Sequence, residues 1–67
     1  MGEYEPWQVR VIEEADELAI KLAKLAEFGH TEGYERLDST DKGLLMAQGL
    51  IMENYHAVLE HRILRFN

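Results

Sequence analysis

Residues 11–25 read VIEEADELAIKLAKL. The apolar residues of this stretch recur at alternating spacings of four and three, which places them along one side of an α-helix. They are Val11, Ala15, Leu18, Leu22 and Leu25. Proline is favoured in the first turn of a helix and glycine just after the last turn, so Pro6 and Gly29 mark its two ends. The sequence therefore predicts a helix over residues 6–28.

A second helical segment follows a short connection. Thr31 is placed to cap a short helical turn over residues 31–37, and the polar run DSTD at residues 38–41 is a dense signal for a helix N-terminus. A long helix is predicted over residues 41–65, and we find no pattern of a β-strand. We therefore expect an all-α fold in which residues 1–67 form one domain. Its architecture is an antiparallel helical hairpin with a short helical turn in the connection.

Composition limits the classes of function. The chain has 67 residues, no cysteine and a net charge of −6. The negative charge argues against a DNA or RNA duplex as partner, since such a partner binds a basic surface, and no apolar run is long enough to span a membrane. A chain this short buries little surface by itself, and disulfide bonds are excluded as a support. Self-association is therefore expected.

Arg62 lies on the apolar side of the second helix. On a helical wheel it clusters with the residues that we expect to face the first helix. That face comprises Leu44, Gln48, Ile51, Met52, Tyr55, Val58, Leu59 and Arg62. A guanidinium group is unstable when it is dry and unpaired. We therefore expect Arg62 to meet a buried acidic partner, a subunit interface or an anionic ligand.

A second apolar stripe lies on the opposite side of this helix, at Met46, Leu50, Ala57 and Leu64. One partner helix cannot cover both sides, and a polar back face is expected of a monomer. The regular spacing favours a homo-oligomer. The alternative is that these are separate exposed apolar side chains, which are common on protein surfaces.

The sequence lacks the usual combinations of catalytic residues. There is no cysteine, Ser39 and Thr40 are interpreted as helix caps, and no glycine-rich phosphate loop occurs. We therefore expect no nucleophilic catalysis, no cofactor and no bound metal. Metal binding stays open as an alternative, because Glu53 and His56 have the Glu-x-x-His spacing of carboxylate-bridged helical sites and Glu60 lies one turn later.

The candidate ligand site lies at the open end of the predicted hairpin. An antiparallel arrangement brings the start of the first helix beside the end of the second and so gathers five side chains. They are Trp7, Gln8, Arg10, Arg62 and Arg65. An indole face can stack on a base, and guanidinium groups bind phosphate through two parallel hydrogen bonds. The set suits a small ligand that carries both a base and a phosphate.

Trp7 and several of the basic residues also have a structural interpretation. Trp7 can plug the core at the open end of the hairpin. Arg10 and Lys21 each lie four residues from a glutamate, a spacing at which ion pairs contribute a few tenths of a kcal/mol. Arg62 can pair with an acidic residue such as Glu14, in which case the chain is a plain structural or interaction hairpin.

Two runs of the sequence carry a resemblance to a known family. The first is PWQVRVIEE at residues 6–14, followed by Glu17-Leu18, Lys21-Leu22 and Lys24-Leu25. The second is LLMAQ at residues 44–48, followed by Met52, Tyr55, Val58-Leu59, Arg62-Ile63 and Phe66. Over residues 6–66 the chain resembles the phage anti-CBASS cyclic-oligonucleotide sponges, whose domain some anti-Thoeris proteins share.

The resemblance implies a function and partners. Such sponges are not enzymes. They assemble as homo-oligomers, typically hexamers, and sequester cyclic dinucleotides such as cyclic GMP-AMP in the cytoplasm of the infected bacterial host. Some also bind cyclic trinucleotides at separate sites. By resemblance, Trp7 stacks on a base of the ligand, and Lys21 and Arg62 contact its phosphates.

Overall fold

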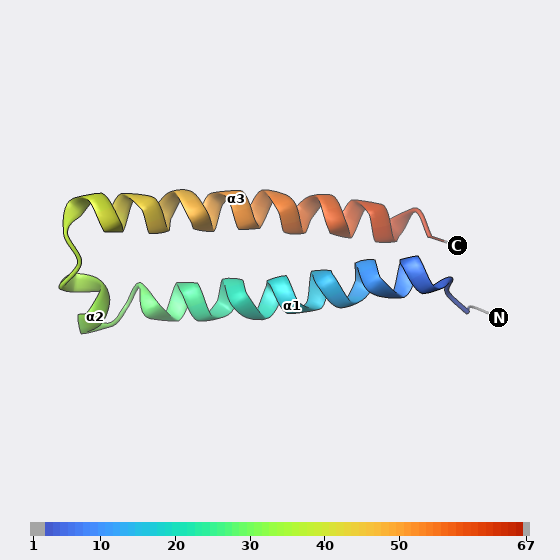
Figure 1. The fold of residues 1–67 in the computed structure, drawn as a ribbon, viewed down its shortest axis with the longest axis horizontal. Coiled ribbons are helices and arrows are strands. Elements are labelled where there is room, and N and C mark those ends of the chain that lie inside the picture. Colours follow the sequence, from blue (N-terminus) through green and yellow to red (C-terminus); the bar gives the residue numbers. More distant parts are fainter. Residues whose placement is uncertain (1–2, 67) are drawn as a thin grey trace.

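The computed structural model of the chain describes residues 3–66. These residues form three helices and no strand: α1 (Pro6–Phe28), α2 (Glu32–Glu35) and α3 (Ser39–Leu64). The long helices α1 and α3 run antiparallel, and α2 lies in the connection between them (Figure 1). The start of α1 and the end of α3 therefore share one end of a rod with extents of 51 × 16 × 14 Å. The predicted all-helical class is confirmed.

Local hydrogen bonds explain where α1 begins and ends. Pro6 occupies the first turn, and the backbone N–H of Glu5 donates to Oε1 of Gln8 at 2.7 Å. Gly29 is the C-cap, and its N–H donates to the carbonyl of Leu25 at 3.2 Å. Gly29 has a φ of −62°. The helix therefore ends there without the left-handed conformation that glycine often supplies.

The connection is held by two side-chain caps. The hydroxyl of Thr31 accepts a hydrogen bond from the N–H of Tyr34 at 3.3 Å, as the predicted capping role requires. The carboxylate of Asp38 accepts from the N–H of Asp41 at 2.8 Å. Asp38 is thus the N-cap of α3, which begins at Ser39 and not at residue 41. The prediction placed this start too late because any of four consecutive polar residues could have been the cap.

The core lies between α1 and α3. Val11, Ala15 and Leu18 are buried on α1, and Leu59 of α3 is only 1% exposed. Further residues of α3 at spacings of four and three are half-buried along the same side. We call this side the inner seam of α3; it comprises Leu45, Gly49, Met52, His56, Leu59 and Ile63. A Cβ on Gly49 would lie 3.3 Å from Cδ2 of Leu25, so this glycine lets the helices approach closely.

The predicted inner face of the second helix is partly wrong. Met52 and Leu59 do face α1, but Leu44, Ile51 and Val58 are 63%, 68% and 55% exposed. Gln48, Tyr55 and Arg62, which were predicted on the same face, are also exposed. The helix packs about one residue further round than predicted, which amounts to about 100° of rotation. This setting keeps the charge of Arg62 in water.

Candidate functional site

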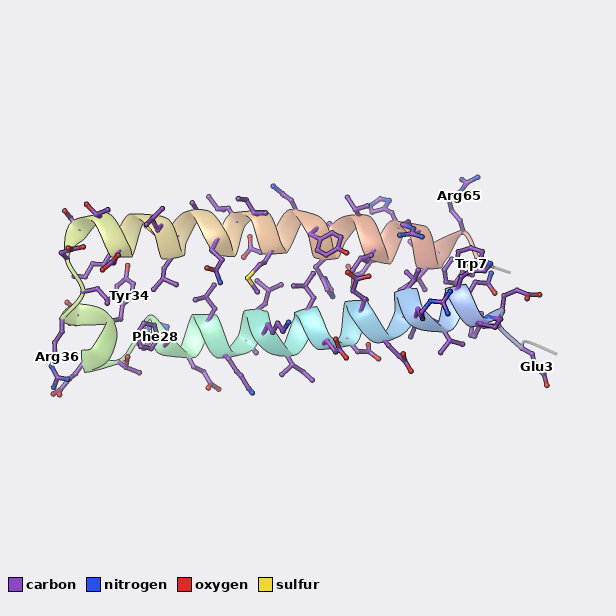
Figure 2. The ribbon with its side chains drawn as sticks, viewed as in Figure 1. Glu3, Trp7, Phe28, Tyr34, Arg36 and Arg65 are labelled. Carbon is purple, nitrogen blue, oxygen red and sulfur yellow. The ribbon has the colours of Figure 1, made fainter. Side chains whose placement is uncertain are left out.

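A hollow at the open end of the hairpin gathers most of the predicted ligand residues. It has a volume of about 420 Å³ and is lined by Trp7, Gln8, Arg62, Arg65 and Phe66. Trp7 lies against the end of α3, and Arg65 points outward from that end (Figure 2). The first turn of α1 and the last turn of α3 build this hollow together, because the two helices are antiparallel.

Trp7 is held by aromatic neighbours but is not buried. Its ring meets Phe66 edge to face, with ring centroids 5.3 Å apart and planes at 81°. Tyr4 reaches the same Phe66 ring at 6.0 Å. The Trp7 side chain is nevertheless 47% exposed, so it only partly closes the core. An indole that is fixed on one side and open on the other can stack on a flat ligand at little entropic cost.

The two arginines of the hollow have free hydrogen-bond donors. Within residues 3–66 neither Arg62 nor Arg65 forms an ion pair; the ion pairs there join Arg36 to Glu32, Lys42 to Glu35 and His56 to Glu60. Both cations lie at the C-terminal end of α3, where the helix dipole favours positive charge. Two guanidinium groups around one hollow suit a phosphate-bearing ligand.

Gln8 combines a structural and a potential binding function. Its Oε1 accepts the hydrogen bond that begins α1. Its amide NH₂ donates no hydrogen bond within residues 3–66, and it carries two donors. Gln8 can therefore cap the helix and offer donors to a ligand at the same time.

Arg10 and Lys21 do not line the hollow. Arg10 follows Trp7 by about one helical turn, and Lys21 lies about 21 Å further along α1 than Trp7, at 1.5 Å per residue. Both are exposed. The ion pairs that the sequence suggests for them with glutamates four residues away are not formed within residues 3–66. One hairpin therefore brings four of the six predicted residues together.

Glu14 has a different partner from the one considered in the sequence. It accepts a hydrogen bond from the hydroxyl of Tyr55, across the two long helices. This bond raises the pKa of Tyr55; partial burial and the charge of Glu14 add to the effect, and the nearby charge of Arg62 opposes it. The pair Arg62–Glu14 is thus replaced by Tyr55–Glu14, which leaves Arg62 free for the hollow.

Sequence reasoning missed Phe66 as a lining residue. Phe66 is half-buried, packs against the core and holds Trp7 in place. A signal for it was present, because Phe66 lies seven residues after Leu59, which predicts the same side of the helix. Tyr55 was also missed as a partner of Glu14, since the hydrogen bond depends on how α3 is rotated.

Two further hollows have the wrong charge for an anionic ligand. One, near the connection, has a volume of about 270 Å³ and is mainly apolar with the carboxylate Glu53 at its wall. The other, of about 390 Å³, is lined by Asp16, His56, Glu60 and apolar residues. Within residues 3–66 there is no group of three or more His, Asp and Glu side chains that could hold a metal ion. The Glu53, His56 and Glu60 set does not form such a group.

Comparisons with known proteins found one family and one similar phage protein. The family model described as Sequestin matches residues 5–65 of the chain. A protein of Enterobacteria phage T4, described as an uncharacterized 7.5 kDa protein in the denB-rIIB intergenic region, is 33% identical over 60 residues. That match covers 90% of this chain and 94% of the phage protein. No solved structure matches the chain. Within residues 3–66, no helix has the length and apolar character needed to cross a membrane.

Proposed function

Because the chain belongs to the Sequestin family, whose name suggests sequestration, we propose that it binds and sequesters cyclic oligonucleotide second messengers. Cyclic dinucleotides such as cyclic GMP-AMP are the first candidates, and cyclic trinucleotides the second. The similarity to a protein of phage T4 supports an action of this kind in an infected bacterial cell. Removing the messenger there blocks CBASS-type immunity, because the effector is no longer activated.

The hollow at the open end is the observation that carries this proposal. A cyclic dinucleotide offers flat bases and two phosphates. Trp7 offers a half-exposed indole for stacking, and base stacking on an aromatic side chain contributes about 1–3 kcal/mol. Arg62 and Arg65 line the hollow and form no ion pair within residues 3–66, so their guanidinium groups can bind phosphate. The local charge of the hollow is positive although the whole chain carries −6, and the local potential is what attracts a bound ligand.

The same hollow suits binding rather than cleavage. Its lining residues are Trp7, Gln8, Arg62, Arg65 and Phe66. None of these five is a histidine or carboxylate, the side chains that most often act as general bases. The ligand therefore stays intact in the bound state.

We further propose that the complete site lies between copies of the chain. Lys21 is about 21 Å from Trp7 along α1, too far for both to contact one cyclic dinucleotide within a single hairpin. A neighbouring copy in a homo-oligomer, a hexamer by the resemblance, supplies Lys21 and Arg10 to the hollow. Exposed apolar side chains on both flanks of α3 support such an assembly. They are Leu44, Ile51 and Val58 on one flank and Met46, Leu50 and Leu64 on the other.

Calorimetry with cyclic GMP-AMP, cyclic di-GMP and a cyclic trinucleotide tests the proposal. Binding at micromolar concentration or tighter is expected for at least one of them. The change of Arg62→Ala should weaken it by about tenfold to a hundredfold, since a hydrogen bond to a charged group contributes about 1.5–3 kcal/mol. Arg36→Ala is the matched control, because Arg36 is exposed at the opposite end of the rod and pairs with Glu32.

Two further measurements complete the test. Sedimentation of the Arg62→Ala protein separates lost binding from lost assembly. Chromatography of the ligand after heat release should recover it unchanged. Absence of binding to every member of the panel, with the assembly intact, contradicts the proposal, and recovery of a cleaved ligand contradicts sequestration.

A further inference from the structure

Helix α3 has apolar residues on three sides. Its inner seam includes Leu45, Met52 and Leu59. Each of these is preceded by another large apolar residue, Leu44, Ile51 and Val58, which are exposed. One residue of an α-helix corresponds to a rotation of about 100° about the helix axis. Turning α3 by this amount brings the preceding, exposed residues toward α1 in place of the residues of the inner seam. Burial of apolar surface alone therefore selects weakly between these two rotational settings.

Besides the exposure of Arg62 and the close approach at Gly49, one polar contact between the two long helices favours the observed setting. Within residues 3–66, the bond from the hydroxyl of Tyr55 to the carboxylate of Glu14 is the one side-chain hydrogen bond that joins α1 to α3. Its acceptor is charged, and charge-assisted hydrogen bonds are stronger than neutral ones. Turning α3 by one residue carries the hydroxyl away from the flank of α1 on which Glu14 lies. The bond exists only in the observed setting.

The two residues of this bond are each seven positions from a residue that lines the hollow. Glu14 follows Trp7 by seven residues, and Tyr55 precedes Arg62 by seven. Seven residues are close to two helical turns, so each pair shares a side of its helix. In an antiparallel hairpin, a setting that places Tyr55 opposite Glu14 also places Arg62 opposite Trp7. The structure shows the Tyr55–Glu14 bond, and Arg62 and Trp7 line the same hollow.

We propose that the Tyr55–Glu14 hydrogen bond is a positioning device that selects the rotational setting of α3 and thereby holds Arg62 in the hollow beside Trp7. In the other setting Arg62 turns toward α1 and leaves the hollow. The effect of the bond on the rotational setting of α3 does not depend on a ligand. Its consequence for binding rests on the proposed function.

Methyl NMR of the unliganded protein, in the assembly that it forms, tests the structural part. In the wild type, methyl groups of Leu59 should show strong nuclear Overhauser effects to Val11 and Leu18, and those of Val58 only weak ones. Tyr55→Phe keeps the ring and removes the hydroxyl. Because this hydrogen bond is exposed to solvent, losing it should shift such an equilibrium only about fivefold. The ratio of Val58 to Leu59 contacts with α1 should therefore rise about fivefold.

Control variants distinguish an effect on the rotational setting of α3 from a general loss of stability. Glu14→Ala should reproduce the effect of Tyr55→Phe, and the double variant should add little, because both changes remove the same bond. Glu14→Gln should restore the wild-type contacts, since its amide oxygen still accepts a hydrogen bond. Tyr34→Phe is the matched control: the hydroxyl of Tyr34 makes no hydrogen bond within residues 3–66, so its removal should change nothing.

The possible outcomes separate this inference from the proposed function. Unchanged Leu59 and Val58 contacts in both Tyr55→Phe and Glu14→Ala overturn the inference, whatever the ligand does. The expected contacts together with a wild type that binds no cyclic oligonucleotide uphold it and overturn the proposed function instead. If both hold, the affinity of Tyr55→Phe for the ligand should fall by up to fivefold, in proportion to the lost population, and Glu14→Gln should recover it.

Discussion

Truncating Leu59 should destabilise this hairpin more than truncating any other leucine of α3. Leu59 is the one large side chain in residues 3–66 that is fully buried, at 1% exposure. Leu59→Ala removes three carbons, which corresponds to about 2.4 kcal/mol at 0.8 kcal/mol per methylene. The cavity that remains brings the expected loss to about 2–5 kcal/mol. Domains of this length have a total stability of roughly 3–10 kcal/mol, so the loss is a large part of the whole.

Thermal unfolding followed by circular dichroism measures the effect. The midpoint should fall by roughly 8–40 °C, at about 4–8 °C per kcal/mol for a domain of this size. Leu64→Ala is the matched control, because Leu64 lies on the same helix and is 80% exposed. The free energy of unfolding of the Leu64→Ala variant should fall by no more than about 0.5 kcal/mol in the isolated hairpin. All midpoints are compared at the same protein concentration, since self-association makes them depend on it.

A Leu64→Ala protein that is less stable than the Leu59→Ala protein refutes this account of the core. A Leu59→Ala protein that loses less than about 1 kcal/mol is incompatible with Leu59 as the centre of the core. A loss at Leu64 that grows with protein concentration has a different meaning. It shows that the exposed flank of α3 is covered by another copy, as the proposed homo-oligomer requires.

Two further predictions concern the glycines of α3 and the hydroxyl of Tyr55. Gly43→Ala should raise the free energy of unfolding by about 0.5–1 kcal/mol, because a Cβ there meets nothing within 4 Å; Gly49→Ala should gain less, because its Cβ would lie 3.3 Å from Leu25. Urea unfolding compares the two, and an equal gain contradicts the close approach. Because Glu14 raises the pKa of Tyr55 above 10.0, the folded state binds the hydroxyl proton more tightly than the unfolded state. The resulting stability should be complete below pH 10 and lost as the pH rises through the raised pKa, and an identical decline in Tyr55→Phe contradicts this.

The local features of the fold could be read from the sequence. Pro6 and Gly29 bound α1, and Thr31 caps the short helix in the connection. These signals act within four residues of chain, so the identity of the residues is nearly sufficient to predict them. The start of α3, which lies at Ser39 and not at about residue 41, was harder to place because four consecutive polar residues compete for the same cap.

The composition of the candidate site was also accessible from the sequence. Antiparallel helices of similar length bring the first turn of one beside the last turn of the other, which gathers Trp7, Gln8, Arg62 and Arg65. A single hairpin does not bring Lys21 to the hollow, because about 21 Å of helix separates it from Trp7. That all of these residues bind a ligand stays a prediction.

The face of α3 that meets α1 could not be decided from the sequence. For α1 the apolar residues form one seam, so only one side can be buried. For α3 two neighbouring sets of leucine, isoleucine, valine and methionine have the same spacing. The choice depends on how closely the backbones approach at Gly49 and on the hydrogen bond from Tyr55 to Glu14.

The sequence by itself therefore determined that the chain is helical, where its helices end and which residues meet at the open end. Helix formation and capping depend on neighbours along the chain, and those are written in the order of residues. The tertiary structure alone decided the rotation of α3, the exposure of Arg62 and the partner of Glu14. These depend on contacts between residues 41 positions apart, such as Tyr55 and Glu14, whose geometry no local pattern contains.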